Sequence, residues 1–168
     1  ENGNSIYGKA KKKSRVLLEG TINSLGGKFT GLIIPNIFGP FCKPNHNSFV
    51  ATFCSKIVNE ESPVIINDAK VPLLYVGNLV NQIIKAIDKP KVSIVDIKQD
   101  VDIKVTEVLS LLNSFKASYI KNNTIPKLKS TFELQLFNTF RSYLDLENRH
   151  PYLLEKHSDQ RGFFSEII

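Results

Sequence analysis

The fold class follows from one stretch of thirteen residues: Lys28-Phe29-Thr30-Gly31-Leu32-Ile33-Ile34-Pro35-Asn36-Ile37-Phe38-Gly39-Pro40. Residues 28–34 form a short apolar run, enriched in β-branched side chains and ended by Pro35, which is typical of a strand buried in a parallel sheet. A Lys-rich stretch without a helix breaker precedes it, from Lys9 to Glu19, with Gly20 just past its end, and predicts a helix. Residues 36–47 contain three Pro or Gly residues and predict a loop.

The alternation of helix and strand continues downstream to about residue 100, after which helices dominate. Apolar residues recur at helical spacing in 49–57, 79–87, 105–119 and 132–144. The expected strands are 64–66, 71–76 and 92–97. Asn47 or Ser48 is placed to cap the first of these helices. The pattern predicts an α/β domain over residues 1–146, and the polar stretch before Pro151 separates it from residues 147–168.

Composition excludes several classes of protein. A chain of 168 residues with 42% hydrophobic content is large enough for one globular core, and no apolar run approaches the ~18 residues of a membrane span. The net charge of +6 is concentrated in residues 9–15 and 116–129, neither of which interleaves aromatics as a single-strand binder does. We therefore expect no nucleic acid or membrane partner. The two basic segments are expected to be solvated helix faces, and residues 9–15 are also able to attract a diphosphate.

The cysteines and the two ends of the chain indicate where the protein works. Cys42 and Cys54 are separated without a CxxC motif, and no His completes a zinc site with them, so two reduced thiols in a cytoplasmic protein are expected, with no metal. No secretory signal is visible at the start. The sequence begins without Met and stops in an apolar run, residues 163–168, so both ends are interpreted as cut.

Tyr7 and Lys11 place a phenol and an ammonium on one face of a helix, one turn apart. A fixed cation favours the phenolate form of a tyrosine, and such a pair can exchange a proton with a carbonyl or a hydroxyl. The spacing alone is weak, because Tyr152 and Lys156 repeat it. An isolated copy is better explained by an exposed helix with a surface lysine.

The context of the first copy resembles a known family. Tyr7-x-x-x-Lys11, then a strand, then the turn at residues 36–40 are similar in order and spacing to the extended short-chain dehydrogenase/reductases, also called the NAD-dependent epimerase/dehydratase family. Residues 43–54, 66–68 and 73–76 look more narrowly like capsular polysaccharide synthesis reductases that carry a C-terminal cupin domain. Residues 156–166 resemble the first strand of that cupin.

The resemblance implies an incomplete Rossmann-like domain, its C-terminal half with the substrate-binding region, followed by the first strand of a β jelly-roll. It implies that Tyr7 is the acid/base for a C4 carbonyl and that Lys11 binds the ribose of the nicotinamide, with Pro35 also at the cofactor. Asn36 and Asn47 are implied to contact the sugar diphosphate, although a turn residue and a helix cap are the structural alternatives. Lys70 stands near the place of a phosphate-binding Arg, without its bidentate fork.

The implied function is reduction of a UDP-linked 4-keto-6-deoxy-N-acetylhexosamine with NADPH in capsular or surface polysaccharide synthesis, by a cytoplasmic homodimer, with zinc only in the cupin part. The alternatives are an NAD-dependent sugar-nucleotide epimerase or dehydratase, and a non-catalytic fragment or binding module in which Tyr7 and Lys11 are relics. The sequence contains no glycine-rich turn for a dinucleotide pyrophosphate, and the family's catalytic Ser or Thr is likewise missing. The chain as given is thus expected to hold half an active site, and NAD against NADP stays open.

Overall fold

The computed structural model describes residues 5–88, 93–145, 147 and 154–165. Its helices are α1 (Ile6–Ser24), α2 (Phe49–Val58), α3 (Val76–Asp88), α4 (Val105–Phe115), the π-helix η1 (Lys116–Lys121) and α5 (Thr131–Arg141). Its strands are β1 (Thr30–Ile33), β2 (Asn36–Phe38), β3 (Lys70–Tyr75), β4 (Ser93–Asp96), β5 (Val101–Lys104), β6 (His157–Asp159) and β7 (Gly162–Phe164). The α/β pattern predicted from the sequence is confirmed.

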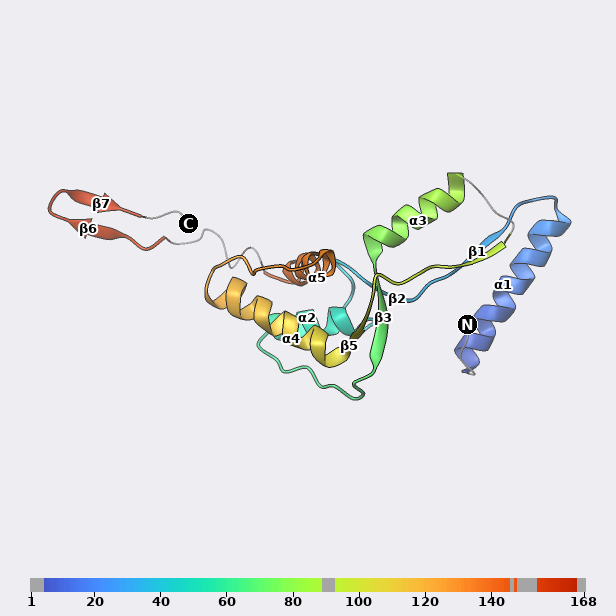
Figure 1. Ribbon diagram of the computed structural model, residues 1–168, viewed down its shortest axis with the longest axis horizontal. Helices are drawn as coiled ribbons and strands as arrows, with labels where there is room; N and C mark the ends of the chain where they lie inside the picture. Colours follow the sequence, from blue (N-terminus) through green and yellow to red (C-terminus); the bar gives the residue numbers. More distant parts are fainter. Residues whose placement is uncertain (1–4, 89–92, 146, 148–153, 166–168) are drawn as a thin grey trace.

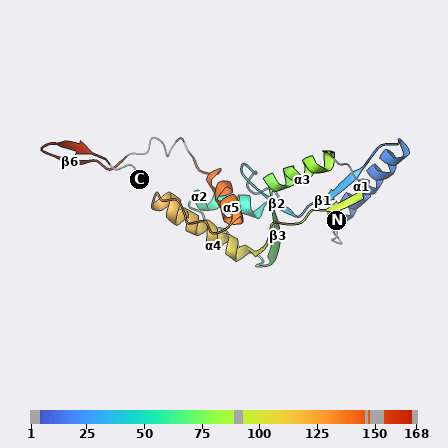
Figure 2. The ribbon, with the colours of Figure 1, turned by 45° about the horizontal axis from the view of Figure 1, so that its top comes forward.

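Apart from the hairpin of β6 and β7, the strands form two small sheets. Strand β1 pairs in parallel with β4, so strands are present within residues 28–34 and 92–97 as predicted, and the parallel pairing expected for the first is confirmed. Strand β3 lies in the middle of the other sheet, parallel to β2 and antiparallel to β5. Helices α2, α4 and α5 lie together beside this second sheet, and α1 lies at the end with β1 (Figures 1 and 2).

Two sequence predictions about short elements were wrong, and one short strand was missed. Residues 36–47 are not all loop, because Asn36–Phe38 form β2, and the strand β5 was not predicted at all. Residues 64–66 form no strand and include a bend at Ile66, and Val64 and Ile66 are 73% and 97% exposed. Strands of three or four residues depend on a neighbour that pairs with them, which periodicity within the segment does not reveal.

Helix α1 is longer than predicted. It passes through Gly20 and ends at Ser24, and Gly26 follows its C-cap Leu25 with a φ of +70°. A left-handed residue just past a helix is the usual stop, and glycine adopts it without steric cost. Gly26, rather than Gly20, therefore ends the helix.

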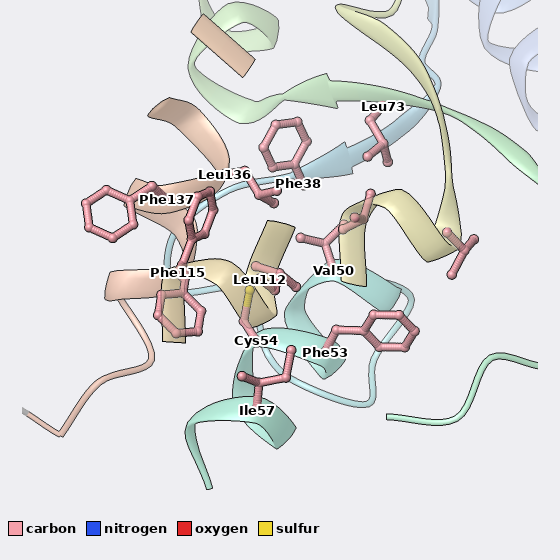
Figure 3. Packing of buried hydrophobic residues seen from close by; sticks show 13 residues of the cluster. Phe38, Val50, Phe53, Cys54, Ile57, Leu73, Leu112, Phe115, Leu136 and Phe137 are labelled. Atoms are coloured by element: carbon pink, nitrogen blue, oxygen red, sulfur yellow. The ribbon is translucent and has the colours of Figure 1, made fainter. Parts of the chain in front are cut away.

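The main hydrophobic core lies between α2, α4, α5 and one face of the sheet β2–β3–β5 (Figure 3). Val50, Cys54, Leu112 and Phe140 are each at most 1% exposed, which confirms the predicted apolar faces of these helices. A second, smaller cluster contains Leu74, Leu79 and Ile97. Because successive side chains of a strand point to opposite faces, Leu73 of β3 belongs to the main core and its neighbour Leu74 to the second.

The predicted burial of the apolar stripe on α3 was wrong for most of its members. Leu79 is buried, but Val80, Ile83, Ile84 and Ile87 are between 36% and 70% exposed. Of the stripe, only Leu79 reaches the cluster beneath the helix, where Leu74 and Ile97 lie. The stripe is therefore a largely exposed apolar face within the described part of the chain.

Residues 157–164 form a β-hairpin rather than the single strand that was expected. His157 pairs with Phe164, and Asp159 pairs with Gly162 across the turn. The hairpin lies beyond the helices in Figure 1. The predicted domain boundary at 146–151 falls outside the described residues except for Glu147. None of the described helices has the length and apolar character that spanning a membrane requires.

The start of α4 is stabilised by a carboxylate from a distant segment, and this contact gives a pH dependence. Asp68 accepts hydrogen bonds from the Thr106 amide and the Thr106 hydroxyl, at 2.9 and 3.0 Å. The backbone hydrogen bond from Thr106 holds the pKa of the Asp68 carboxyl below its ordinary value of 3.8. Because this pKa is lowered by folding, the stabilisation is present above the unfolded-state pKa and is lost as the pH falls through the folded-state pKa.

We therefore expect Asp68→Ala to lower the free energy of unfolding at neutral pH, and the difference from the wild type to shrink as the pH drops below 3.8. Urea denaturation of both proteins at a series of pH values measures this difference. A difference that stayed constant over the whole series would contradict a role for the ionised carboxylate.

Candidate functional site

A hollow of about 590 Å³ lies between the first turn of α1, the strand β2 and the loop that leads to α2. Four of the six predicted site residues line it: Tyr7, Pro35, Asn36 and Asn47. They come from three segments of the chain: the first turn of α1, the start of β2 and the loop before α2. The structure therefore brings together most of the residues that the sequence singled out.

Tyr7 lies in the first turn of α1, which begins where Ser5 caps the helix. The Ser5 hydroxyl accepts a hydrogen bond from the Gly8 amide at 3.1 Å. The Tyr7 side chain is 72% exposed, and the Lys11 ammonium lies 5.4 Å from the centre of its ring. The phenol and the cation are thus on the same face of α1, as the four-residue spacing predicts, and the phenol is open to a ligand in the hollow.

The strand β2 is fixed by its last residue and by the glycine that follows. Phe38 is 1% exposed and packs its ring against Tyr75 and Phe132, with centroid distances of 5.5 and 5.6 Å. A Cβ at Gly39 would lie 2.3 Å from a methyl carbon of Val76, closer than atoms can approach. Glycine is therefore required for the end of β2 to lie against the start of α3, which is the physical reason for glycine in this turn.

The loop from Phe41 to Asn47, here called the 41–47 loop, is held in an unusual backbone conformation. Phe41, Asn45 and Asn47 have left-handed φ values of 63°, 58° and 58°. Asn tolerates this region better than other non-glycine residues, whereas an aromatic residue adopts it rarely. The Asn45 amide donates to the Thr52 hydroxyl of α2 at 2.9 Å, which fixes the loop to the helix that follows it.

Ser48, rather than Asn47, caps α2. The Ser48 hydroxyl accepts a hydrogen bond from the Ala51 amide at 3.3 Å, so the Asn47 carboxamide is not committed to the helix start. Both residues line the hollow. The dipole of a helix start favours an anion, so the side of the hollow that Asn47 and Ser48 line suits a phosphate group.

Asn36 and Lys70 have structural positions of their own. The Asn36 side chain donates to the Pro72 carbonyl at 3.4 Å, and so connects β2 to β3 as well as lining the hollow. Lys70 is the first residue of β3 and pairs with Lys104 of β5. The residue of β3 that pairs with Asn36 is Leu73, three positions later. It is not among the residues of the hollow, so the structure does not bring Lys70 to the other predicted site residues.

Among the residues that line the hollow without having been assigned a role from the sequence are Phe41, Cys42 and His46. Phe41 and Cys42 directly follow the Asn-Ile-Phe-Gly-Pro turn and His46 lies in the same loop, so the turn was the available signal for them. Both cysteines are free, and burial raises the pKa of the Cys54 thiol above its ordinary value, so Cys54 is an inert core residue.

The order of these elements agrees with comparison to known proteins. Residues 2–97 match the model of the NAD dependent epimerase/dehydratase family. The chain belongs to this family. The resemblance seen in the sequence is thereby confirmed, together with its α/β Rossmann-like fold.

Two relatives of this epimerase/dehydratase chain are similar over nearly all of it. The UDP-2-acetamido-2,6-beta-L-arabino-hexul-4-ose reductase of Pseudomonas aeruginosa is 31% identical over 96% of the chain. The crystal structure of the capsular polysaccharide assembling protein CapF from Staphylococcus aureus is 32% identical over 99% of the chain, with a TM-score of 0.82. The chain spans 44% of the length of the first and 47% of the second.

A more distant solved structure has a similar fold. The UDP-N-acetylglucosamine 4-epimerase of Methanobrevibacter ruminantium M1, solved with UDP-N-acetylmuramic acid, is 19% identical, covers 83% of this chain and has a TM-score of 0.70, and the chain covers 54% of that structure. At this identity the match bears on the architecture alone. It places the strands and helices of this chain in the common scaffold of the family.

Proposed function

We propose that the protein containing this chain reduces a UDP-linked 4-keto-6-deoxy-N-acetylhexosamine with NADPH in the synthesis of capsular or surface polysaccharide. The observation that carries the proposal is the Tyr7 phenol at the edge of a hollow, with the Lys11 ammonium 5.4 Å from its ring and the start of α2 across from it. The names of the two relatives, a UDP-sugar reductase and a capsular polysaccharide assembling protein, support this choice of substrate class.

In this proposal Tyr7 donates a proton to the C4 oxygen of the sugar as the carbonyl is reduced. A general acid of this kind contributes about 10²- to 10⁴-fold to the rate. Lys11 stabilises the phenolate that remains and binds neighbouring hydroxyl groups, since an ammonium provides three donors and no acceptor. Asn47 and the start of α2 bind the diphosphate, which orients the sugar toward Tyr7.

The residues of the hollow fit the ribose end of a nicotinamide cofactor. Tyr7 and Pro35 line one side of it and Lys11 stands one turn along the same helix, so a hydroxyl-rich group is matched by a phenol and an ammonium. When bound, such a cofactor supplies the hydride that reduces the carbonyl carbon. Lys11 would hold its ribose and Pro35 would lie beside it.

The remaining parts of the proposal concern the whole protein. We propose that it is a cytoplasmic homodimer and that residues 147–168 begin a cupin-like domain, in which a zinc site would lie. The antiparallel pairing of β6 with β7 is compatible with the first strands of a β jelly-roll. Lys70, the first residue of β3, is proposed to attract the substrate phosphates as a point charge.

The test is an assay of the complete gene product with the 4-keto sugar nucleotide and NADPH, monitored by loss of the reduced cofactor. Consumption of one NADPH per sugar reduced supports the proposal. Interconversion of two UDP-sugars without net use of NADPH would indicate an epimerase instead, and binding of UDP-sugar without any turnover would indicate a binding module. The same assay with NADH decides the cofactor.

The 168-residue chain by itself is expected to show negligible affinity for NADPH. Its sequence has no glycine-rich strand-turn-helix, and such a turn is what binds the pyrophosphate of a dinucleotide. Calorimetric titration of this chain with NADPH measures the affinity directly. Sub-micromolar binding would show that the cofactor site has been misplaced.

A further inference from the structure

The 41–47 loop carries much of the lining of the hollow, yet its backbone is unfavourable. Each non-glycine residue in a sparsely populated conformation costs about 1–3 kcal/mol and persists only where its surroundings hold it. Phe41 is the most demanding of the three left-handed residues, because it is aromatic and its side chain is 87% exposed. Something other than packing of its own ring must therefore hold Phe41 in place.

Two contacts from the end of α5 hold this part of the loop. The Tyr143 hydroxyl donates to the Cys42 carbonyl at 2.6 Å. The Ser142 hydroxyl accepts from the Phe41 amide at 3.1 Å and donates its own hydrogen to the Thr139 carbonyl at 2.7 Å. The side chains of two consecutive residues, Ser142 and Tyr143, thus bind backbone groups of two consecutive loop residues. These groups are the amide of Phe41, which is the left-handed residue, and the carbonyl of Cys42.

These two side chains stand on a rigid base. Thr139 and Phe140, in the last turn of α5, are 0% exposed, and Tyr143 packs partly buried against the main core. Burial raises the pKa of the Tyr143 phenol above its ordinary value, so the hydroxyl keeps its proton and remains a donor at neutral pH. A donor fixed by the core gives the loop a defined position rather than a range of positions.

We infer that Ser142 and Tyr143 are positioning residues of the substrate site, which hold the 41–47 loop in the shape that presents Asn47 and the start of α2 to the diphosphate of a nucleotide sugar. The inference rests on the proposed function. Neither residue lines the hollow, so each acts through the loop and not by contact with the ligand. A ligand that must order the loop for itself binds more weakly than one that meets it already ordered.

The test is calorimetric titration of the complete gene product with UDP, a probe that carries the diphosphate but no reacting sugar. Tyr143→Phe keeps the packed ring and removes only the donor, and we expect it to weaken UDP binding about five- to tenfold, the effect of losing one such hydrogen bond. Tyr119→Phe is the matched control, because it removes a phenol from the same core in another element, against Phe137. UDP affinity should be unchanged in the control.

A second readout separates positioning from a general loss of stability. In Tyr143→Phe, hydrogen exchange of the loop amides at Phe41 and Asn45 should accelerate, while exchange in α4 stays as in the wild type. In the enzyme assay the KM for the sugar nucleotide should rise while kcat changes little.

A double variant tests whether Tyr143 acts through Asn47. Asn47→Gly tolerates the left-handed backbone and removes the carboxamide. When it is combined with Tyr143→Phe, the loss of UDP affinity should be less than the sum of the two single losses.

The outcomes distinguish this inference from the proposed function. No UDP binding by the wild type would overturn both. Wild-type UDP binding with equal affinity in Tyr143→Phe would overturn the positioning role alone. If Tyr143→Phe does not fold, Ser142→Ala decides, because it removes the other contact to the loop and leaves every ring of the core in place; unchanged UDP affinity in that variant would likewise end the inference.

Discussion

Replacing Tyr7 by phenylalanine is expected to lower the turnover of the complete gene product by about 10²- to 10⁴-fold, while NADPH binding stays close to unchanged. The hydroxyl is the only group lost, and its proposed contribution is proton transfer in the transition state. The side chain is 72% exposed, so its replacement should leave the fold intact. Steady-state kinetics and cofactor titration of the two proteins measure the effect.

Two other substitutions serve as references for Tyr7→Phe. Lys11→Ala should weaken cofactor binding as well as the rate, since the ammonium is assigned to both the ribose hydroxyls and the phenolate. Tyr152→Phe alters the second Tyr-x-x-x-Lys copy of the sequence and should keep the wild-type rate. If Tyr7→Phe kept more than about a tenth of the rate, the loss would be too small for a positioned general acid, and Tyr7 would be an ordinary exposed helix residue.

Truncation of Phe115 to alanine is expected to lower the free energy of unfolding by about 3–5 kcal/mol, a typical loss for a fully buried aromatic side chain. Phe115 is 2% exposed and connects α4 to α5 through ring contacts with Phe137 and Phe140, at 5.3 and 6.1 Å between centroids. Urea denaturation of the wild type and the variant, compared at the same slope, gives the difference.

Ile66→Ala is the control for this measurement. Ile66 is 97% exposed, and an exposed substitution away from special contacts usually changes stability by less than about 0.5 kcal/mol. Equal losses for the Phe115 and Ile66 variants would contradict the position of the main core between α2, α4 and α5.

The longer elements were predictable because each carries its own signal. Residues 49–57 and 105–119 have apolar side chains at helical spacing, and most members of the predicted faces are buried. The second helix changes to the π-helix η1 after Phe115, which spacing did not predict. The three-residue strand β2 and the strand β5 were missed because each depends on pairing with β3. Strand β3 is distant from both in the sequence, and it runs antiparallel to β5. Local periodicity contains no information about such a partner.

The stripe on α3 shows a different limit of sequence reasoning. Its apolar spacing predicts a helix correctly, but spacing cannot tell which element covers the face. Among the described residues only Leu79 of this stripe is buried. The type of element was therefore predictable and its environment was not.

The site was predictable in part for a similar reason. Tyr7, Pro35, Asn36 and Asn47 belong to motifs with a recognisable order, and the structure gathers them around one hollow. Lys70 was assigned by analogy with an Arg at a nearby position in relatives. It lies at the start of β3, whereas the hollow is lined by Val76, which follows the end of that strand. Tyr143 carried no signal at all, because a phenol that donates to a backbone carbonyl can do so from any distant position in the chain.

The contacts from α5 to the 41–47 loop also have a consequence for biosynthesis. Phe41 and Ser142 are separated by 101 positions, as are Cys42 and Tyr143. At about 5–20 residues per second, a ribosome completes the end of α5 roughly 5–20 s after it has made the loop. During that interval the nascent loop has neither of its α5 partners, so its left-handed conformation at Phe41 can become stable only after the end of α5 has been made.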